Sequence, residues 1–324
     1  MNHVRSFDFL KFILSFFVIA IHCYTAPHLV LLDVAVPLYF MMSGFLLYNK
    51  AIHSVTALEK VSSCDKYVKH IFKLYITWSL IYLPYTIYGF YALDGSYMGK
   101  LLCIIRGFLL VGENYLSWPL WYLLGLVVSV LIIRTFINCS KFTLNQLFLV
   151  SVLFLITGMV LNRSIDSPIL PIKVISKVYF SVFATTRNGV FCGFPLVMLG
   201  MMIAKYSTFA TNTRTIVVGG GILLALICLQ YMGVGVPFLI YLCSAWILLF
   251  FIKIGVTFGK NDIFLRKMSL MIFLVHMIPV GLFTIFLPEI NRHILFIVSS
   301  ILSYILAYII LKLSYKYKCI SIIM

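Results

Sequence analysis

Residues 5–24 read RSFDFLKFILSFFVIAIHCY, an apolar run that is interrupted by Asp8, Lys11, Ser15 and His22. At 100° per residue along an α-helix, these four residues fall within an arc of roughly 60°, and Lys11 and His22 lie about 20° apart. Ionisable groups near the centre of a membrane span cost roughly 2.5–3.5 kcal/mol for Asp, Lys or Arg, and they usually face a protein interior or a cavity. The pattern therefore predicts a transmembrane helix with an inward-facing polar seam that lines a functional site.

Two other interpretations of this segment are open. Arg5, Asp8 and Lys11 are also typical of a solvated helix flank, and a lone His near a helix end often satisfies a backbone carbonyl. A cleaved signal peptide also has basic residues before an apolar run. Here, however, Cys23 follows His22 instead of a small residue, and another long apolar run comes next. We expect the helix to be retained.

The composition predicts an all-α, polytopic membrane protein. The chain has 324 residues, of which 63% are hydrophobic and 10% charged, and its mean hydropathy is +1.08. Apolar runs of about 17–21 residues are long enough to span a bilayer. They predict about ten transmembrane helices, at residues 9–25, 31–48, 71–90, 119–137, 145–161, 189–204, 215–232, 236–253, 268–287 and 293–313. The apolar stretch at 101–111 is too short to span, which indicates an interfacial or re-entrant segment.

The distribution of basic residues predicts the orientation. With both termini cytoplasmic, 18 of the 25 Lys and Arg residues fall on the cytoplasmic side, as the positive-inside rule requires. The formal net charge of +16 is thereby explained by topology and by anionic inner-leaflet lipid, and it does not indicate nucleic-acid binding. We expect a single membrane-embedded domain over residues 1–324 with no separate soluble domain.

Several classes of site are not supported by the sequence. The eight cysteines form no C-x-x-C pair and no metal-ligand spacing with His, so we expect no disulfide framework and no metal. No internal repeat and no Walker-type phosphate loop is present, which gives no support for an ATP-driven pump.

Distance limits how the polar residues of the first helix cooperate. Lys11 and His22 are 11 residues apart, which corresponds to about 16 Å along an α-helix, and Asp8 is farther still. A His–Asp dyad of His22 and Asp8 is therefore excluded within one straight helix. Asp8 and Lys11, at i and i+3, are instead expected to pair with each other at the cytoplasmic end.

Two further segments contain candidate substrate-binding residues. Ser43, in PLYFMMSGFLLY, offers a hydroxyl beside a glycine, although close packing explains the same residues. The segment ENYLSWPLWY at 113–122 brings Glu113 and Trp118 to the outer end of a helix. Aromatic residues are ordinary at membrane interfaces, but they also stack on the apolar faces of sugar rings.

Arg187 and His276 complete the candidates. Arg187 precedes an apolar span on the side where positive-inside statistics do not favour it, and a guanidinium can stabilise an anionic group or a developing oxyanion. An interfacial anchor is the alternative. His276, in RKMSLMIFLVHMIP, lies near mid-membrane, where a single His is either functional or a donor to a carbonyl.

These segments occur together and in order in one known family. They are DFLKFILSFFVIAIH, PLYFMMSGFLL, WPLWYL, RNGVFCGFPLVMLG and SLMIFLVH. Over most of its length the chain resembles the acyltransferase 3 family of bacterial integral-membrane acyltransferases, whose members mostly O-acetylate cell-surface and secreted glycans. In that family the first-helix motif pairs an Arg with a catalytic His 11 positions later. The His position here is His22, whereas the Arg position is occupied by Lys11, which keeps the charge but not the bidentate fork.

The resemblance implies transfer of an acyl group, with acetyl expected, from acyl-CoA to a hydroxyl of a cell-envelope or exported glycan, free or lipid-linked. His22 is expected to act as general base, with Lys11 and Asp8 in the same catalytic seam. Acetyl-CoA would be a donor co-substrate and no cofactor is expected to be tightly bound. Lys69 and Lys73 are expected to meet the phosphates of the donor. The expected location is the bacterial cytoplasmic membrane, in contact with membrane lipid, and assembly into a homo-oligomer is left open.

Three alternatives to this function are open. A flippase or exporter of a polysaccharide or its precursor also needs many helices, an aromatic mouth and a polar seam, although no pair of corresponding broken helices is evident. A glycosyltransferase that uses lipid-linked sugars would normally carry acidic residues in a sizeable first outer loop, which here is only about residues 26–30. Acylation of a non-glycan acceptor, such as an amino acid whose carboxylate meets Arg187, is the third.

Overall fold

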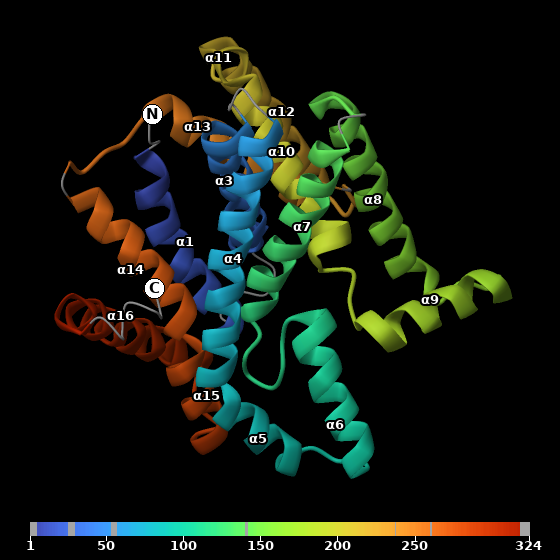
Figure 1. Ribbon diagram of the computed structural model, residues 1–324, viewed down its shortest axis with the longest axis vertical. Helices are drawn as coiled ribbons and strands as arrows, with labels where there is room; N and C mark the ends of the chain where they lie inside the picture. The colour runs from blue at the N-terminus through green and yellow to red at the C-terminus, as the bar shows by residue number, and fades with distance from the viewer. Residues whose placement is uncertain are drawn as a thin grey trace. The chain divides into compact units, whose positions relative to one another are not determined.

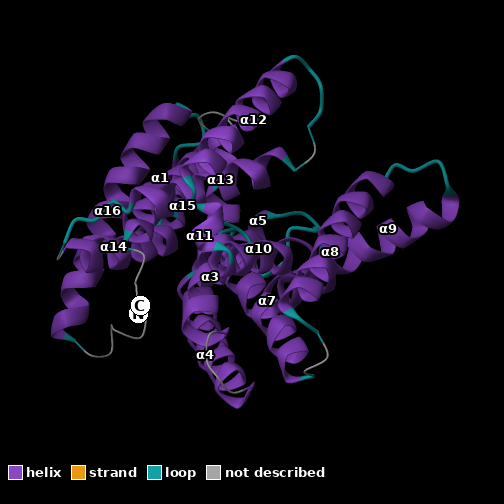
Figure 2. Cartoon of the chain, turned by 90° about the horizontal axis from the view of Figure 1, so that it is seen from above, coloured by secondary structure: helices purple, strands orange, loops and turns teal. Residues whose placement is uncertain are grey.

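The computed structural model describes residues 5–24, 30–52, 57–139, 142–236, 238–259 and 261–317. The protein is 83% helical, and no strand occurs in these ranges (Figures 1 and 2). The predicted all-α class is therefore confirmed. The predicted end of the first helix at Thr25 lies outside the described residues.

Among the described residues, six helical stretches are long and apolar enough to cross a membrane. They are α1 (Ser6–Cys23), α7 (Leu120–Asn138), α8 (Leu144–Ser164), α12 (Thr213–Tyr231), the pair α14 (Asn261–Val275) and α15 (Met277–Phe286), and α16 (Arg292–Lys316). Two shorter apolar stretches are the π-helical segment η3 (Gly189–Gly193) with α10 (Phe194–Lys205), and α13 (Leu239–Ile254). Ten spans and cytoplasmic termini stay predictions.

The chain between the second and fourth predicted spans differs from expectation. Instead of one helix at 71–90, α4 runs over Ala57–Ile81 and α5 over Leu83–Ala92. The start of α4 was missed because its first turns are too rich in lysine to resemble a membrane span, although lysine is a good helix former. The break between the two helices falls at Tyr82, next to Pro84 in the first turn of α5, where a missing N–H is tolerated.

Two of the longer helices lie outside the predicted spans. The short stretch at 101–111 belongs to α6 (Tyr97–Arg106) and the π-helical segment η2 (Gly107–Val111). A further helix, α9 (Leu170–Phe183), has Lys173 and Lys177 in an otherwise apolar sequence. Because the two lysines interrupt the apolar run, the sequence contains no apolar run of spanning length here.

The contacts group the chain into two compact units. Unit 1 contains the residues up to Asn49 and those from Leu199 onward, and unit 2 contains Lys50–Met198. The prediction of a single domain is not tested by this grouping. Besides α12–α16, unit 1 contains α1, α2 (Val30–Asp33), α3 (Ala35–Leu47) and α11 (Ser207–Ala210), while the π-helical segment η1 (Tyr48–Ile52) and α10 cross the boundary.

Within unit 1, α1 packs along α14, and α16 packs against both (Figure 1). α1 buries four apolar residues at i, i+3 and i+4 spacing, namely Phe7, Leu10, Leu14 and Val18. One face of the helix is therefore buried in the protein. On α16, Ser303 is fully buried and donates a hydrogen bond to the Ser299 carbonyl at 2.6 Å. Small residues allow helix backbones to approach closely in a membrane.

The closest approach in unit 1 gives a stability prediction. A Cβ built on Gly200 of α10 would lie 2.7 Å from the carbonyl carbon and 2.8 Å from the Cα of Met41 on α3. Backbone atoms cannot move aside as the end of a side chain does, so Gly200→Ala is expected to destabilise the protein by about 1–3 kcal/mol. Gly221→Ala on α12 is the matched control, because its Cβ meets nothing within 4 Å. Thermal unfolding in one detergent would compare them; equal midpoints would contradict the prediction.

In unit 2, α4 packs against α7, and α7 packs against η3. The hydroxyl of Ser129 donates to the Gly125 carbonyl of its own helix at 2.6 Å and to the Gly189 carbonyl of η3 at 2.9 Å. A Cβ on Gly189 would lie 2.5 Å from the Gly125 oxygen, so only glycine allows this contact. The contact fixes Gly189, the first residue of η3, which follows Arg187 and Asn188 in the chain.

Candidate active site

Two histidines that are far apart in the sequence form a pair in unit 1. His22 lies in the last turn of α1, and His276 lies at the junction of α14 and α15. The two rings stack with their centroids 5.3 Å apart and 29° between the ring planes. His276 is fully buried, with 0% of its surface exposed, whereas His22 is half-buried. His22 is therefore the member of the pair that a substrate can reach.

The break between α14 and α15 places His276. Pro279 has no N–H with which to continue the helical hydrogen bonding, and α14 ends at Val275. The Nδ1 atom of His276 lies 2.8 Å from the Phe273 carbonyl oxygen. A carbonyl can only accept, so Nδ1 carries the proton and the neutral ring offers its Nε2 as an acceptor.

That Nε2 atom is buried and has no hydrogen-bond partner among the described residues. A buried polar atom without a partner costs free energy, so it calls for a specific explanation. Here the orphan acceptor belongs to the ring that stacks on His22. The pair therefore combines an accessible imidazole with a buried acceptor.

The N-terminal end of α1 carries a cluster of charges. Asp8 is buried, with 2% of its surface exposed, and Lys11 interacts electrostatically with Asp8 and with Arg266 of α14. The Nε atom of Arg5 lies 3.9 Å from the Oδ2 atom of Asp262, which also belongs to α14. Asp8 and Lys11 therefore influence each other electrostatically, their expected pairing stays a prediction, and α14 adds a second layer of charge. Sequence reasoning missed Arg266 because it belongs to a basic flank that topology alone explains.

The other polar residues on these helices are held locally. The Ser15 hydroxyl donates to the Phe12 carbonyl of its own helix at 2.7 Å. The Tyr39 hydroxyl of α3 donates to the Lys11 carbonyl at 2.8 Å, which ties α3 to the middle of the seam. Ser43, one turn farther along α3, is buried in unit 1.

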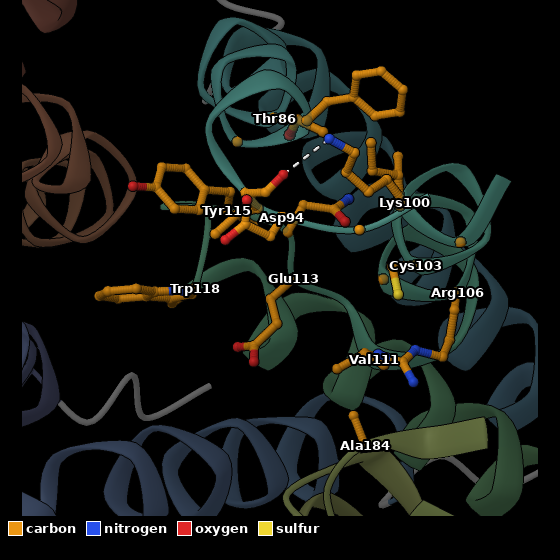
Figure 3. Close-up of a pocket in the computed structure, with 18 of the residues that line it drawn as sticks. Thr86, Asp94, Lys100, Cys103, Arg106, Val111, Glu113, Tyr115, Trp118 and Ala184 are labelled. Atoms are coloured by element: carbon orange, nitrogen blue, oxygen red, sulfur yellow. Dashed lines mark hydrogen bonds between the residues drawn. The ribbon is translucent and has the colours of Figure 1, made fainter. Parts of the chain in front are cut away.

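Glu113, Trp118 and Arg187 come together in unit 2. Glu113 and Trp118 line a cavity of about 520 Å³ (Figure 3). The guanidinium of Arg187 lies 5.7 Å from the Trp121 ring centroid. Burial raises the pKa of the Glu113 carboxyl, and the positive charge of Arg187 acts against that rise. The structure groups these three predicted residues, but in a different unit from the histidine pair.

Lys69 and Lys73 are both exposed on α4 in unit 2. They lie one turn apart, so they share a face of the helix. Within the described ranges, no group of three or more His, Cys, Asp or Glu side chains could hold a metal ion.

The fold and the site define a class of protein. Six apolar helical stretches of spanning length among the described residues, together with a stacked histidine pair in unit 1, are features of a multi-pass membrane protein with a polar site. The model of the acyltransferase 3 family, described as an acyltransferase domain, matches residues 4–312. The chain therefore belongs to this family of acyltransferases.

A curated relative adds little to this assignment. A serine/alanine racemase from Enterococcus gallinarum is 24% identical over 234 residues, which cover 65% of this chain. The match covers only 30% of that protein, so the chain spans less than a third of its length. No solved structure matches the chain.

Proposed function

We propose that this acyltransferase moves an acyl group, acetyl in the first instance, from acyl-CoA to a hydroxyl of a cell-envelope or exported glycan, with His22 as general base. Family membership supports acyl transfer in general. The observation that carries the choice of base is the stacked pair, in which His22 is accessible and His276 is buried. The proposed location is the bacterial cytoplasmic membrane, and the acceptor is free or lipid-linked.

The reaction needs one proton to move twice. His22 takes the proton from the acceptor hydroxyl as its oxygen forms a bond to the thioester carbonyl carbon. The tetrahedral intermediate then breaks its carbon–sulfur bond. The CoA thiolate leaves with the proton that His22 held, so that the products are an ester and CoA thiol and the enzyme is unchanged.

His276 fits a positioning role in this scheme. Two charged imidazoles with ring centroids 5.3 Å apart would repel each other, so the pair accepts one additional proton at a time. The bond from Nδ1 to the Phe273 carbonyl fixes the ring, and its Nε2 is an acceptor near the reacting groups.

We assign Lys11 and Asp8 to the entrance of the seam and not to the chemical step. The distance of about 16 Å along the helix separates Lys11 from His22. A cationic side chain beside Asp8 and Arg266 suits the anionic parts of a donor that enters from the cytoplasm. This makes Lys11 a binding residue.

Lys69 and Lys73 are proposed to bind donor phosphates, which predicts a kinetic effect. The variant Lys69→Glu/Lys73→Glu is expected to raise the KM for acetyl-CoA about tenfold and to leave kcat within about twofold, because it removes ground-state attraction. Lys173→Glu/Lys177→Glu is the matched control, since this pair has the same spacing on α9. Initial rates over a range of acetyl-CoA concentrations would show the difference. An equal rise of KM in both variants would contradict a specific donor site.

Transfer of labelled acetyl groups tests the proposed function. Membranes that contain the protein would receive acetyl-CoA labelled in the acetyl group, and the glycan fraction would be analysed by mass spectrometry. We expect base-labile label on glycan hydroxyls. Unlabelled glycan in membranes that still export it would favour the flippase or exporter alternative, and label on an amino acid or peptide would indicate a non-glycan acceptor.

A further inference from the structure

The cavity in unit 2 is not used by the histidine pair. It encloses about 520 Å³ between α5, α6, η2 and the loop that precedes α7. Figure 3 shows Trp118 and Tyr115 on one side, Lys100 and Arg106 on the opposite side, and Glu113 between them. Small-molecule sites of this size usually combine apolar walls with a few placed polar groups.

Two glycines shape the cavity. A Cβ on Gly89 of α5 would lie 2.5 Å from the Cβ of Tyr115, and one on Gly107 would lie 2.5 Å from the Glu113 carbonyl oxygen. The loop can lie this close to α5 and η2 only because both positions lack a side chain. The Ser117 hydroxyl accepts from the Asn114 N–H at 2.8 Å, which holds the loop in its bend. These close contacts and this hydrogen bond therefore fix the positions of Glu113 and Tyr115.

The cations in the wall already have acceptors. The ammonium of Lys100 donates to the Leu93 carbonyl at 2.9 Å and lies 5.3 Å from the Phe90 ring centroid. Arg106 donates from Nη1 to the Ser181 carbonyl at 2.9 Å, and its Nε is buried without a hydrogen-bond partner among the described residues. Neither cation makes an ion pair with a carboxylate within the described ranges.

The acids in the wall have no such partners. Neither Glu113 nor Asp94 makes a hydrogen bond or an ion pair with any residue that the structure describes, and Arg187 acts on Glu113 only through its field. A carboxylate offers about four acceptor positions. The carboxylates of Glu113 and Asp94 therefore leave acceptor positions unused in the cavity wall, and a ligand that brings donors fits them.

We propose that this cavity binds one pyranose ring of the acceptor, with hydroxyl or ammonium donors toward Glu113 and an apolar ring face against Trp118 and Tyr115. The aromatic side chains supply flat apolar surfaces, and the carboxylate supplies the acceptor that sugar hydroxyls need. A neutral sugar and an amino sugar share this chemistry. The inference rests on the proposed function in one respect, namely that the acceptor is a glycan.

Saturation-transfer NMR on the full chain in lipid nanodiscs tests the site. Nanodiscs are required because maltoside detergents themselves contain pyranose rings. The probes are methyl glucoside, methyl N-acetylglucosaminide and methyl glucosaminide, which differ in the donors beside the ring. We expect binding that weakens about tenfold in Glu113→Gln and in Trp118→Ala, as for loss of one charge-assisted contact or one stacking surface. Glu289→Gln, at an exposed carboxylate in unit 1, is the matched control.

The outcomes separate the sugar site from the catalytic proposal. Binding of all three probes indicates recognition of hydroxyls, and binding of methyl glucosaminide alone indicates an ammonium contact; both support the site. Absence of binding by every probe overturns it, as does unchanged binding in both variants with unchanged thermal stability. His22→Ala should bind the probes like the wild type. If it also transferred acetyl normally, the catalytic proposal would fail while the sugar site stood.

Discussion

Replacing His22 with alanine should lower acetyl transfer to glycan by about 10²–10⁴-fold while the protein remains folded. General-base catalysis by a positioned side chain contributes an effect of this size, and no second accessible imidazole pairs with His276 in the described part of unit 1. Because His22 is half-buried at the end of α1, truncation leaves the buried face of that helix intact. The measurement is the initial rate of label transfer from acetyl-CoA in membranes with matched protein content.

His293→Ala is the control for this result. His293 is exposed in the first turn of α16, so it is an imidazole of the same unit without a ring partner among the described residues. The control should transfer acetyl at the wild-type rate. A His22→Ala protein that transfers acetyl groups as fast as this control would remove His22 from the mechanism, whatever its stability.

The sequence predicted each histidine but not their pairing. The cost of polar groups in a membrane marks His22 and His276 independently. Their contact depends on how α1 packs along α14 and on the break that Pro279 introduces, and neither follows from the periodicity of one segment. Arg266 was missed for the same reason, since only the packing brings it near Lys11.

The cavity shows a different limit of sequence reasoning. Glu113 and Trp118 were predicted from their residue types, but Lys100 and Arg106 were not, because the stretch at 101–111 was interpreted by length alone as interfacial or re-entrant. The signal that was available lies in Gly89 and Gly107. A glycine within a helix indicates a close backbone approach, yet only the structure reveals that the partner is the loop with Glu113.

Replacing His276 with asparagine should lower acetyl transfer about 10–100-fold without a change in the KM for acetyl-CoA. The asparagine amide can still donate to the Phe273 carbonyl, as Nδ1 does, but it has no atom at the position of Nε2. Folding should therefore be preserved, and the loss should fall on kcat. Initial rates and thermal unfolding of His276→Asn and His276→Phe would be compared, because phenylalanine fills the space but removes both nitrogens.

Combining the substitutions decides whether His276 acts through His22. If the buried ring only positions its neighbour, His22→Ala/His276→Asn should transfer acetyl no more slowly than His22→Ala alone, since residues that act as a unit have non-additive effects. A double variant slowed by the product of the two single effects would show that His276 contributes to the reaction separately. The stacking at 5.3 Å and the single buried acceptor both favour the first result, in which the pair behaves as one catalytic unit.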